Sequence, residues 1–201
     1  MSRLVNIYDA DDHFLSRGSD EARAADLAVP VSGGVKGFTG ALDKLVTEGR
    51  TFDRAVISTH GNEGLIAFNH EHITASTWRR LAGRGYDRIF PGYARIYFPG
   101  CNVAESEAGW AFLEEAAKVF LYRGGGDVFA HTTKGLAVGS WPMRAMAVLY
   151  NQVNPVRRVL GIAADVAVWA GLKGKIVHPP WTTVRGCLVM PGGIVWRRYE
   201  N

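Results

Sequence analysis

The sequence predicts a single α/β domain with a mainly parallel central sheet, and three observations support this fold class. Short apolar runs, typical of buried parallel strands, recur at residues 3–8, 55–57, 95–98 and 127–130. Helical patterns separate these runs, as in repeated β-α-β units. The length of 201 residues suits one domain with one hydrophobic core.

The first half of the chain alternates strands and helices. The strand at 3–8 runs into an acidic loop, a helix is expected at 41–46 with Gly49 ending it, and the strand at 55–57 follows. Residues 65–68 and 71–73, separated by Asn69 and His70, predict a small hairpin. A short helix at 76–82 then leads to the strand at 95–98.

The clearest helix covers residues 106–121. Its apolar residues share one face at helical spacing, namely Trp110, Leu113, Ala117 and Phe120. Three glycines at 124–126 end this helix before the strand at 127–130. The alternation of strand and helix therefore continues to about residue 133.

The C-terminal third is predicted to hold two helical stretches and a hairpin. Residues 143–150 and 156–169 are helix-like and are separated by Asn154 and Pro155. We interpret the second stretch as a core helix, since Arg157, Arg158 and Asp165 argue against a membrane span. Residues 185–190 and 194–199, joined by a Pro-Gly turn, predict a β-hairpin.

Composition excludes several classes of function. The chain is 47% hydrophobic and 21% charged, which is typical of a globular domain, and it has no apolar run of the roughly 20 residues that a membrane span needs. The net charge of +4 comes from scattered Arg and Lys, which predicts no nucleic-acid partner. The N-terminus has no secretory signal pattern, so the cytoplasm and export without a signal peptide both stay open as locations.

Two motifs carry the residues that could perform chemistry. His60 and Gly61 follow one apolar strand, and Gly100 and Cys101 follow another. The carboxyl ends of parallel strands meet at one edge of a sheet, where α/β proteins bind ligands. We therefore expect the imidazole of His60 and the thiol of Cys101 to lie close together.

A thiol and an imidazole at such an edge can form a nucleophile and base pair. An unperturbed thiol, with a pKa near 8.5, is only a few per cent thiolate at neutral pH, so a cysteine nucleophile needs a base or a cation beside it. His60 is the expected base. The N–H groups of Gly61 and Cys101 are the expected oxyanion hole. Gly61, and Gly100 directly before Cys101, allow the backbone to approach a substrate carbonyl.

These motifs resemble those of the caspase-like (clan CD) cysteine peptidases. The segments "ISTHGNEG" and "FPGCNVAESEAGWAFL" are most similar to the Ser-His-Gly and Gly-Cys-Asn motifs of bacterial caspase-like and CHAT-type domains, with Thr59 in place of the serine. The resemblance covers about residues 3–133. It implies a three-layer caspase-like domain, a His60-Cys101 dyad, a thioester acyl-enzyme, a protein or peptide substrate, and no metal or cofactor.

The resemblance also implies which residues bind the substrate. The loop after the first strand would line the pocket for the residue before the scissile bond, and here it is acidic: Asp9, Asp11 and Asp12 would suit Lys or Arg. Arg17 in the same loop would instead suit an acidic residue, so the charge of the pocket stays open. His131, at the end of the next strand, departs from the family pattern, in which a small residue is expected there; if it faces the site, it would bind substrate or replace His60 as the base.

Other interpretations remain open. Cys101 is alternatively a small buried hydrophobic residue, as is expected of Cys187, and the acidic loop is alternatively a solvated one. The chain would then be an inactive caspase-like pseudo-protease that acts as a scaffold, with residues 140–201 docking a protein partner. A thiol-dependent acyl transferase or deamidase is a further possibility. A zinc site from His60, Cys101 and His131 would need a ligand-spacing motif that the sequence lacks.

Overall fold

The computed structural model describes residues 3–12, 25–133, 136–137, 176–177 and 183–201. The two helices predicted at 143–150 and 156–169 lie outside the described residues, as does Arg17.

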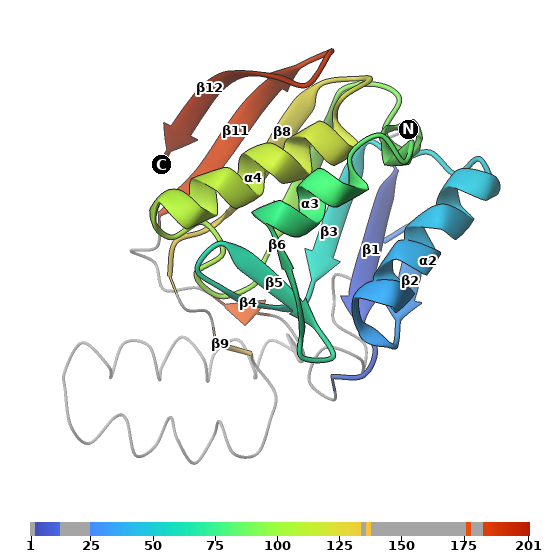
Figure 1. The fold of residues 1–201 in the computed structure, drawn as a ribbon, viewed down its shortest axis with the longest axis horizontal. Coiled ribbons are helices and arrows are strands. Elements are labelled where there is room, and N and C mark those ends of the chain that lie inside the picture. The colour runs from blue at the N-terminus through green and yellow to red at the C-terminus, as the bar shows by residue number, and fades with distance from the viewer. Residues whose placement is uncertain (1–2, 13–24, 134–135, 138–175, 178–182) are drawn as a thin grey trace.

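A seven-stranded sheet forms the centre of the molecule, in the order β12-β11-β8-β7-β3-β1-β2 (Figure 1). Its strands are β1 (Leu4–Asp9), β2 (Leu27–Val31), β3 (Arg54–Ser58), β7 (Ala94–Phe98), β8 (Gly126–His131), β11 (Val184–Met190) and β12 (Ile194–Glu200). The five strands from β2 to β8 pair in parallel, whereas β11 and β12 pair antiparallel. The predicted α/β class with a mainly parallel sheet is confirmed, and so is the C-terminal hairpin, which adds β11 directly to β8.

Two smaller sheets lie outside the main one. The first contains β4 (His60–Asn62), β5 (Leu65–Phe68) and β6 (Glu71–Thr74), and the second pairs β9 (Leu136–Ala137) with β10 (Ile176–Val177). The predicted hairpin of β5 and β6 is confirmed. Its two turn residues, Asn69 and His70, have φ of 44° and 64°, the left-handed values that tight hairpin turns require. Strand β4 was not predicted.

The described helices all cover one face of the central sheet (Figure 1). They are α2 (Gly34–Thr47), α3 (Ala75–Leu81), α4 (Ser106–Phe120) and the 3₁₀ helix η1 (Tyr86–Ile89). Trp78 of α3 lies at the centre of this layer, fully buried among the rings of Phe38, Phe98, Phe112 and Phe120. The described residues therefore form two layers, and the third layer that the resemblance implies has no helix among them.

Two predicted helices need correction, and one strand was missed. Helix α2 begins at Gly34 rather than near residue 41, because Glu71 accepts the N–H of Val35 from a distant strand. Strand β2 was missed because it contains Pro30, which is tolerated here since β2 is an edge strand. On α4, Phe112 and Ala116 belong to the buried face, and Trp110 lies at its margin.

The strand order places a topological switch point beside the predicted site. The chain leaves β1 to form β2 on one side of it, and β3, β7 and β8 follow in turn on the other side. Loops that leave β1 and β3 therefore diverge at the carboxyl ends of these strands, which is the usual position of ligand sites in open α/β sheets. Asp12 follows β1 and His60 follows β3, so both lie at this point.

Two glycines of α2 provide a matched test of the packing of this helix. A Cβ at Gly37 would lie 1.8 Å from the carbonyl oxygen of Ser32, whereas a Cβ at Gly40 would meet no atom within 4 Å. We predict that Gly40→Ala raises the free energy of unfolding by about 0.5–1 kcal/mol through lower unfolded-state entropy. Gly37→Ala should lower it by about 1–3 kcal/mol through overpacking. Chemical denaturation of both variants measures the difference, and equal effects would contradict the described start of α2.

Candidate active site

His60 is the first residue of β4, two residues after the end of β3. The two residues before His60, Ser58 and Thr59, are buried and hydrogen-bonded. The hydroxyl of Ser58 donates to Asn6 Oδ1 at 2.9 Å, and that of Thr59 donates to the carbonyl of Ala67. Pairing of β4 with β5 fixes the next residue. The side chain of His60 is consequently directed outward, with 62% of it exposed.

Asp12 provides the partner of the His60 ring. It lies in the loop that follows β1, and its Oδ2 contacts His60 Nε2. The Asp12 side chain is only 9% exposed, so its carboxylate is shielded from water on most sides. This contact joins the His60 ring to the loop that follows β1.

The other two acids of this loop hold the backbone. Asp9 is buried and accepts the N–H groups of Asp11 and Asn69 at 3.1 and 2.9 Å. Asp11 accepts the N–H of Gly33, just before α2, at 2.8 Å. These contacts explain an acidic cluster without a substrate, and they shape the loop that brings Asp12 to His60.

Cys101 lies in the loop between β7 and α4, half-buried and outside any disulfide. Two backbone hydrogen bonds attach this loop to the end of β8. The N–H of Asn102 donates to the carbonyl of Thr133 at 3.1 Å, and the N–H of Ala104 donates to that of His131 at 3.0 Å. Val103 and Ala104 are fully buried and anchor the loop in the core.

The segments that carry His60 and Cys101 pack directly against each other. A Cβ at Gly61 would lie 2.4 Å from Val103 Cγ2 and 2.9 Å from the carbonyl oxygen of Cys101, and a Cβ at Gly100 would lie 3.1 Å from the Cα and N of Gly61. Glycine at both positions therefore relieves crowding, and a Cβ at Gly61 would force the Cys101 segment to shift. The sequence prediction that the two motifs meet at the ends of adjacent parallel strands is therefore consistent with the fold, since β3 pairs with β7.

The turn between β4 and β5 extends this contact. The N–H of Gly64 donates to the carbonyl of Val103 at 3.2 Å, and the hydroxyl of Ser106 donates to Glu63. The two motifs therefore contact along most of their length.

His131 lies one strand further along the sheet, as the sequence predicts. Its Nε2 is 2.7 Å from the hydroxyl of Tyr97 on β7, and the two rings pack edge to face. Tyr97 in turn stacks on Phe129. This places His131 on the face of the sheet opposite the helices, where a role in substrate binding stays a prediction.

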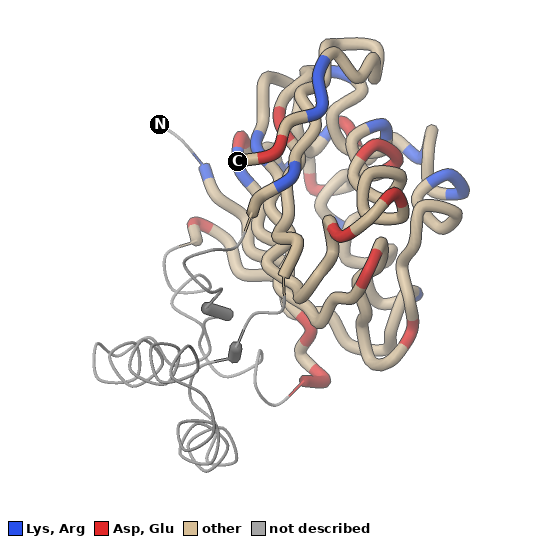
Figure 2. Tube along the Cα trace, turned by 90° about the vertical axis from the view of Figure 1, so that its left-hand side faces the viewer, with Lys and Arg blue, Asp and Glu red and all other residues tan. Residues whose placement is uncertain are grey.

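Positive and negative charges are mixed over the surface of the described part of the chain. Lys and Arg positions are interspersed with Asp and Glu positions in the described part of the chain (Figure 2).

Among the described residues, no group of three or more His, Cys, Asp and Glu side chains is arranged to hold a metal ion. None of the described helices has the length and apolar character needed to cross a membrane.

A surface hollow of about 570 Å³ lies away from these motifs. It is lined by residues around η1, the end of α4 and the β11–β12 turn, including Arg88, Lys118 and Arg123. Lys118 and Arg123 pair with Glu115 and Asp87. Its lining contains no histidine or cysteine.

The two cysteines differ in environment, which gives a direct prediction. Cys187 is fully buried on β11, and this burial, together with the nearby charge of Glu114, raises the pKa of its thiol to about 12. We predict that iodoacetamide at pH 8 labels Cys101 in the folded protein and spares Cys187, because the thiolate is the reactive form. Peptide mapping after labelling checks this. Labelling of Cys187 before unfolding would contradict its described burial.

Comparison with known protein families, curated proteins and solved structures finds no match for this chain. The resemblance of its two motifs to caspase-like peptidases consequently stays a prediction. The function must be argued from the residues at this edge of the sheet.

Proposed function

We propose that this protein is a cysteine peptidase in which Cys101 is the nucleophile and His60 the general acid and base. The observation that carries the proposal is the packing of the His60 segment against the Cys101 segment, with Asp12 on the far nitrogen of the His60 ring. Nucleophilic catalysis by cysteine requires a thiol within reach of an oriented imidazole, and the contact between the two segments supports this arrangement. The resemblance of the two motifs to the caspase-like peptidases supports the same assignment.

Asp12 acts as a positioning residue in this proposal. Because its carboxylate contacts Nε2, the proton of the neutral ring belongs on Nε2, and Nδ1 is left to accept the proton of the Cys101 thiol. The same carboxylate stabilises the imidazolium that forms. This role replaces the expectation that Asp12 pairs with a basic side chain of the substrate.

The reaction follows from these positions. His60 Nδ1 takes the thiol proton as Cys101 Sγ attacks the carbonyl carbon of the scissile bond, and the N–H groups of Gly61 and Cys101 stabilise the oxyanion. Collapse breaks the C–N bond as His60 returns the proton to the leaving amine, which leaves a thioester. Water, deprotonated by His60, then attacks the thioester, and the acid product and the thiol are released.

General physical magnitudes indicate how much each of these parts would contribute to the rate. A positioned acid-base group contributes about 10²–10⁴-fold. Each oxyanion donor contributes on the order of 3 kcal/mol. Asp9 and Asp11 already accept backbone N–H groups, so their charge does not indicate which substrate residue is preferred.

The proposal is tested with a mixed peptide library and a matched pair of cysteine variants. Cys101→Ala should abolish cleavage, because it removes the nucleophile. Cys187→Ala, at a buried position remote from the motifs, should retain it. Mass spectrometry of the products measures both and gives the preferred cleavage residue.

Two outcomes would count against the peptidase. Undiminished cleavage by Cys101→Ala would show that another group performs the chemistry. Absence of cleavage by the wild-type protein, together with binding of an intact protein through the same face, would favour the scaffold alternative.

A further inference from the structure

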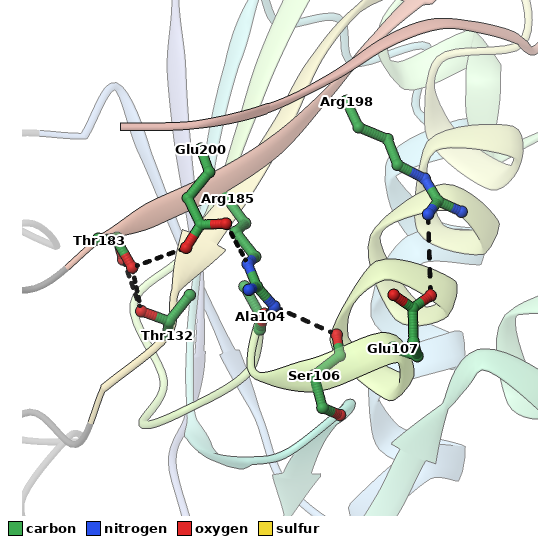
Figure 3. Close-up of polar contacts among 8 residues, drawn as sticks. All are labelled: Ala104, Ser106, Glu107, Thr132, Thr183, Arg185, Arg198 and Glu200. Carbon is green, nitrogen blue, oxygen red and sulfur yellow. Dashed lines mark hydrogen bonds and ion pairs between the residues drawn. The ribbon is translucent and has the colours of Figure 1, made fainter.

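The C-terminal hairpin of β11 and β12 contacts the loop that carries Cys101. The contact is made by Arg185 at the start of β11 (Figure 3). Its Nη1 donates to the carbonyl of Ala104 at 3.2 Å and to that of Ser106 at 3.4 Å. One guanidinium therefore spans the last part of the loop and the first residue of α4.

This loop needs such support because its backbone is strained. Asn102 and Ser106 have φ of 55° and 57°, in the left-handed region that non-glycine residues seldom occupy. Such conformations persist only when the surrounding contacts determine them. Asn102 directly follows Cys101, so a relaxation of the loop would move the thiol.

Arg185 is itself held by Glu200 and Trp110. Its Nε lies 3.0 Å from Glu200 Oε2 on β12, its guanidinium lies 5.3 Å from the centre of the Trp110 ring, and its side chain is 21% exposed. Glu200 also accepts from the hydroxyl of Thr183 at 3.4 Å, and Thr183 contacts Thr132 at the end of β8 (Figure 3). The C-terminal hairpin thus braces the loops that follow both β7 and β8.

We propose that Arg185 is a positioning residue for Cys101, which it serves by holding the carbonyls of Ala104 and Ser106. The inference rests on the proposed function, since it assigns Arg185 to the same thiol. A planar guanidinium suits the task because its donors reach two carbonyls and a carboxylate at once, which a lysine ammonium on a flexible stem does less well.

The chain offers a matched control in Arg198. This residue lies on β12 of the same hairpin, and its guanidinium is also 5.3 Å from the Trp110 ring. Its ion pairs, however, join it to Glu114 at 2.6 Å and Glu107 at 3.8 Å on α4. Removal of Arg198 therefore removes a contact of the same hairpin with α4, while the hydrogen bonds of Arg185 to the carbonyls of Ala104 and Ser106 stay in place.

The experiment compares Arg185→Ala and Arg198→Ala in the full chain. Kinetics on a cleaved peptide, alkylation of Cys101 by iodoacetamide and amide hydrogen exchange at Asn102 and Ala104 are measured for both. We expect Arg185→Ala to lower kcat by about tenfold or more with little change in KM, because small misplacements of reacting groups cost up to roughly 10²-fold. Exchange at both amides should accelerate, and millimolar methylguanidine should restore part of the rate.

Arg198→Ala should match the wild-type protein in kcat and in loop exchange. If Arg185→Ala does not fold, Arg185→Lys replaces it, with the same expectation and a smaller loss. The inference is overturned if both arginine variants lose activity equally, or if alkylation and exchange are unchanged in the Arg185 variant. Failure of the proposed function looks different, because the wild-type protein would then cleave no peptide while alkylation and exchange still show whether Arg185 holds the loop.

Discussion

The close approach of two backbones at Gly61 and Gly100 is the constraint on which the rest of the site depends. A Cβ at Gly61 would lie 2.4 Å from Val103 Cγ2, and one at Gly100 would lie 3.1 Å from the backbone of Gly61, so a side chain at either position would crowd the opposite segment. This contact packs the segment that carries His60 against the segment that carries Cys101. It thereby connects the fold of the sheet to the chemistry proposed for these two residues.

Much of the fold could be predicted because it depends on local patterns. Continuous apolar runs predicted the parallel strands, and the Asn69-His70 pair predicted the β5–β6 turn, whose left-handed φ values suit it. The start of α2 could not be predicted, because it is set by Glu71 from another sheet. Strand β2 was missed because Pro30 is compatible with a strand only at a sheet edge, and strand order is a property of the whole fold.

The candidate site, like the fold, could be predicted only in part. The placement of His60 and Cys101 at the ends of neighbouring strands follows from strand order and could be predicted. The contact of Asp12 with His60 Nε2 depends on which acid of a three-acid loop is left over after backbone N–H groups take the others. The contact of Arg185 with the Cys101 loop joins residues about eighty positions apart in the chain, and no periodicity in the sequence reports it.

The central proposal is that Asp12 orients the ring of His60 so that Nδ1 accepts the proton of the Cys101 thiol. Nitrogen-15 NMR of the His60 ring tests it most directly, because the shifts of the two ring nitrogens identify the tautomer of the neutral imidazole. The account predicts a proton on Nε2 and a bare Nδ1 in the wild-type protein, and a mixture of tautomers in Asp12→Asn. A neutral His60 that carries its proton on Nδ1, in a folded protein with Asp12 intact, would contradict the account.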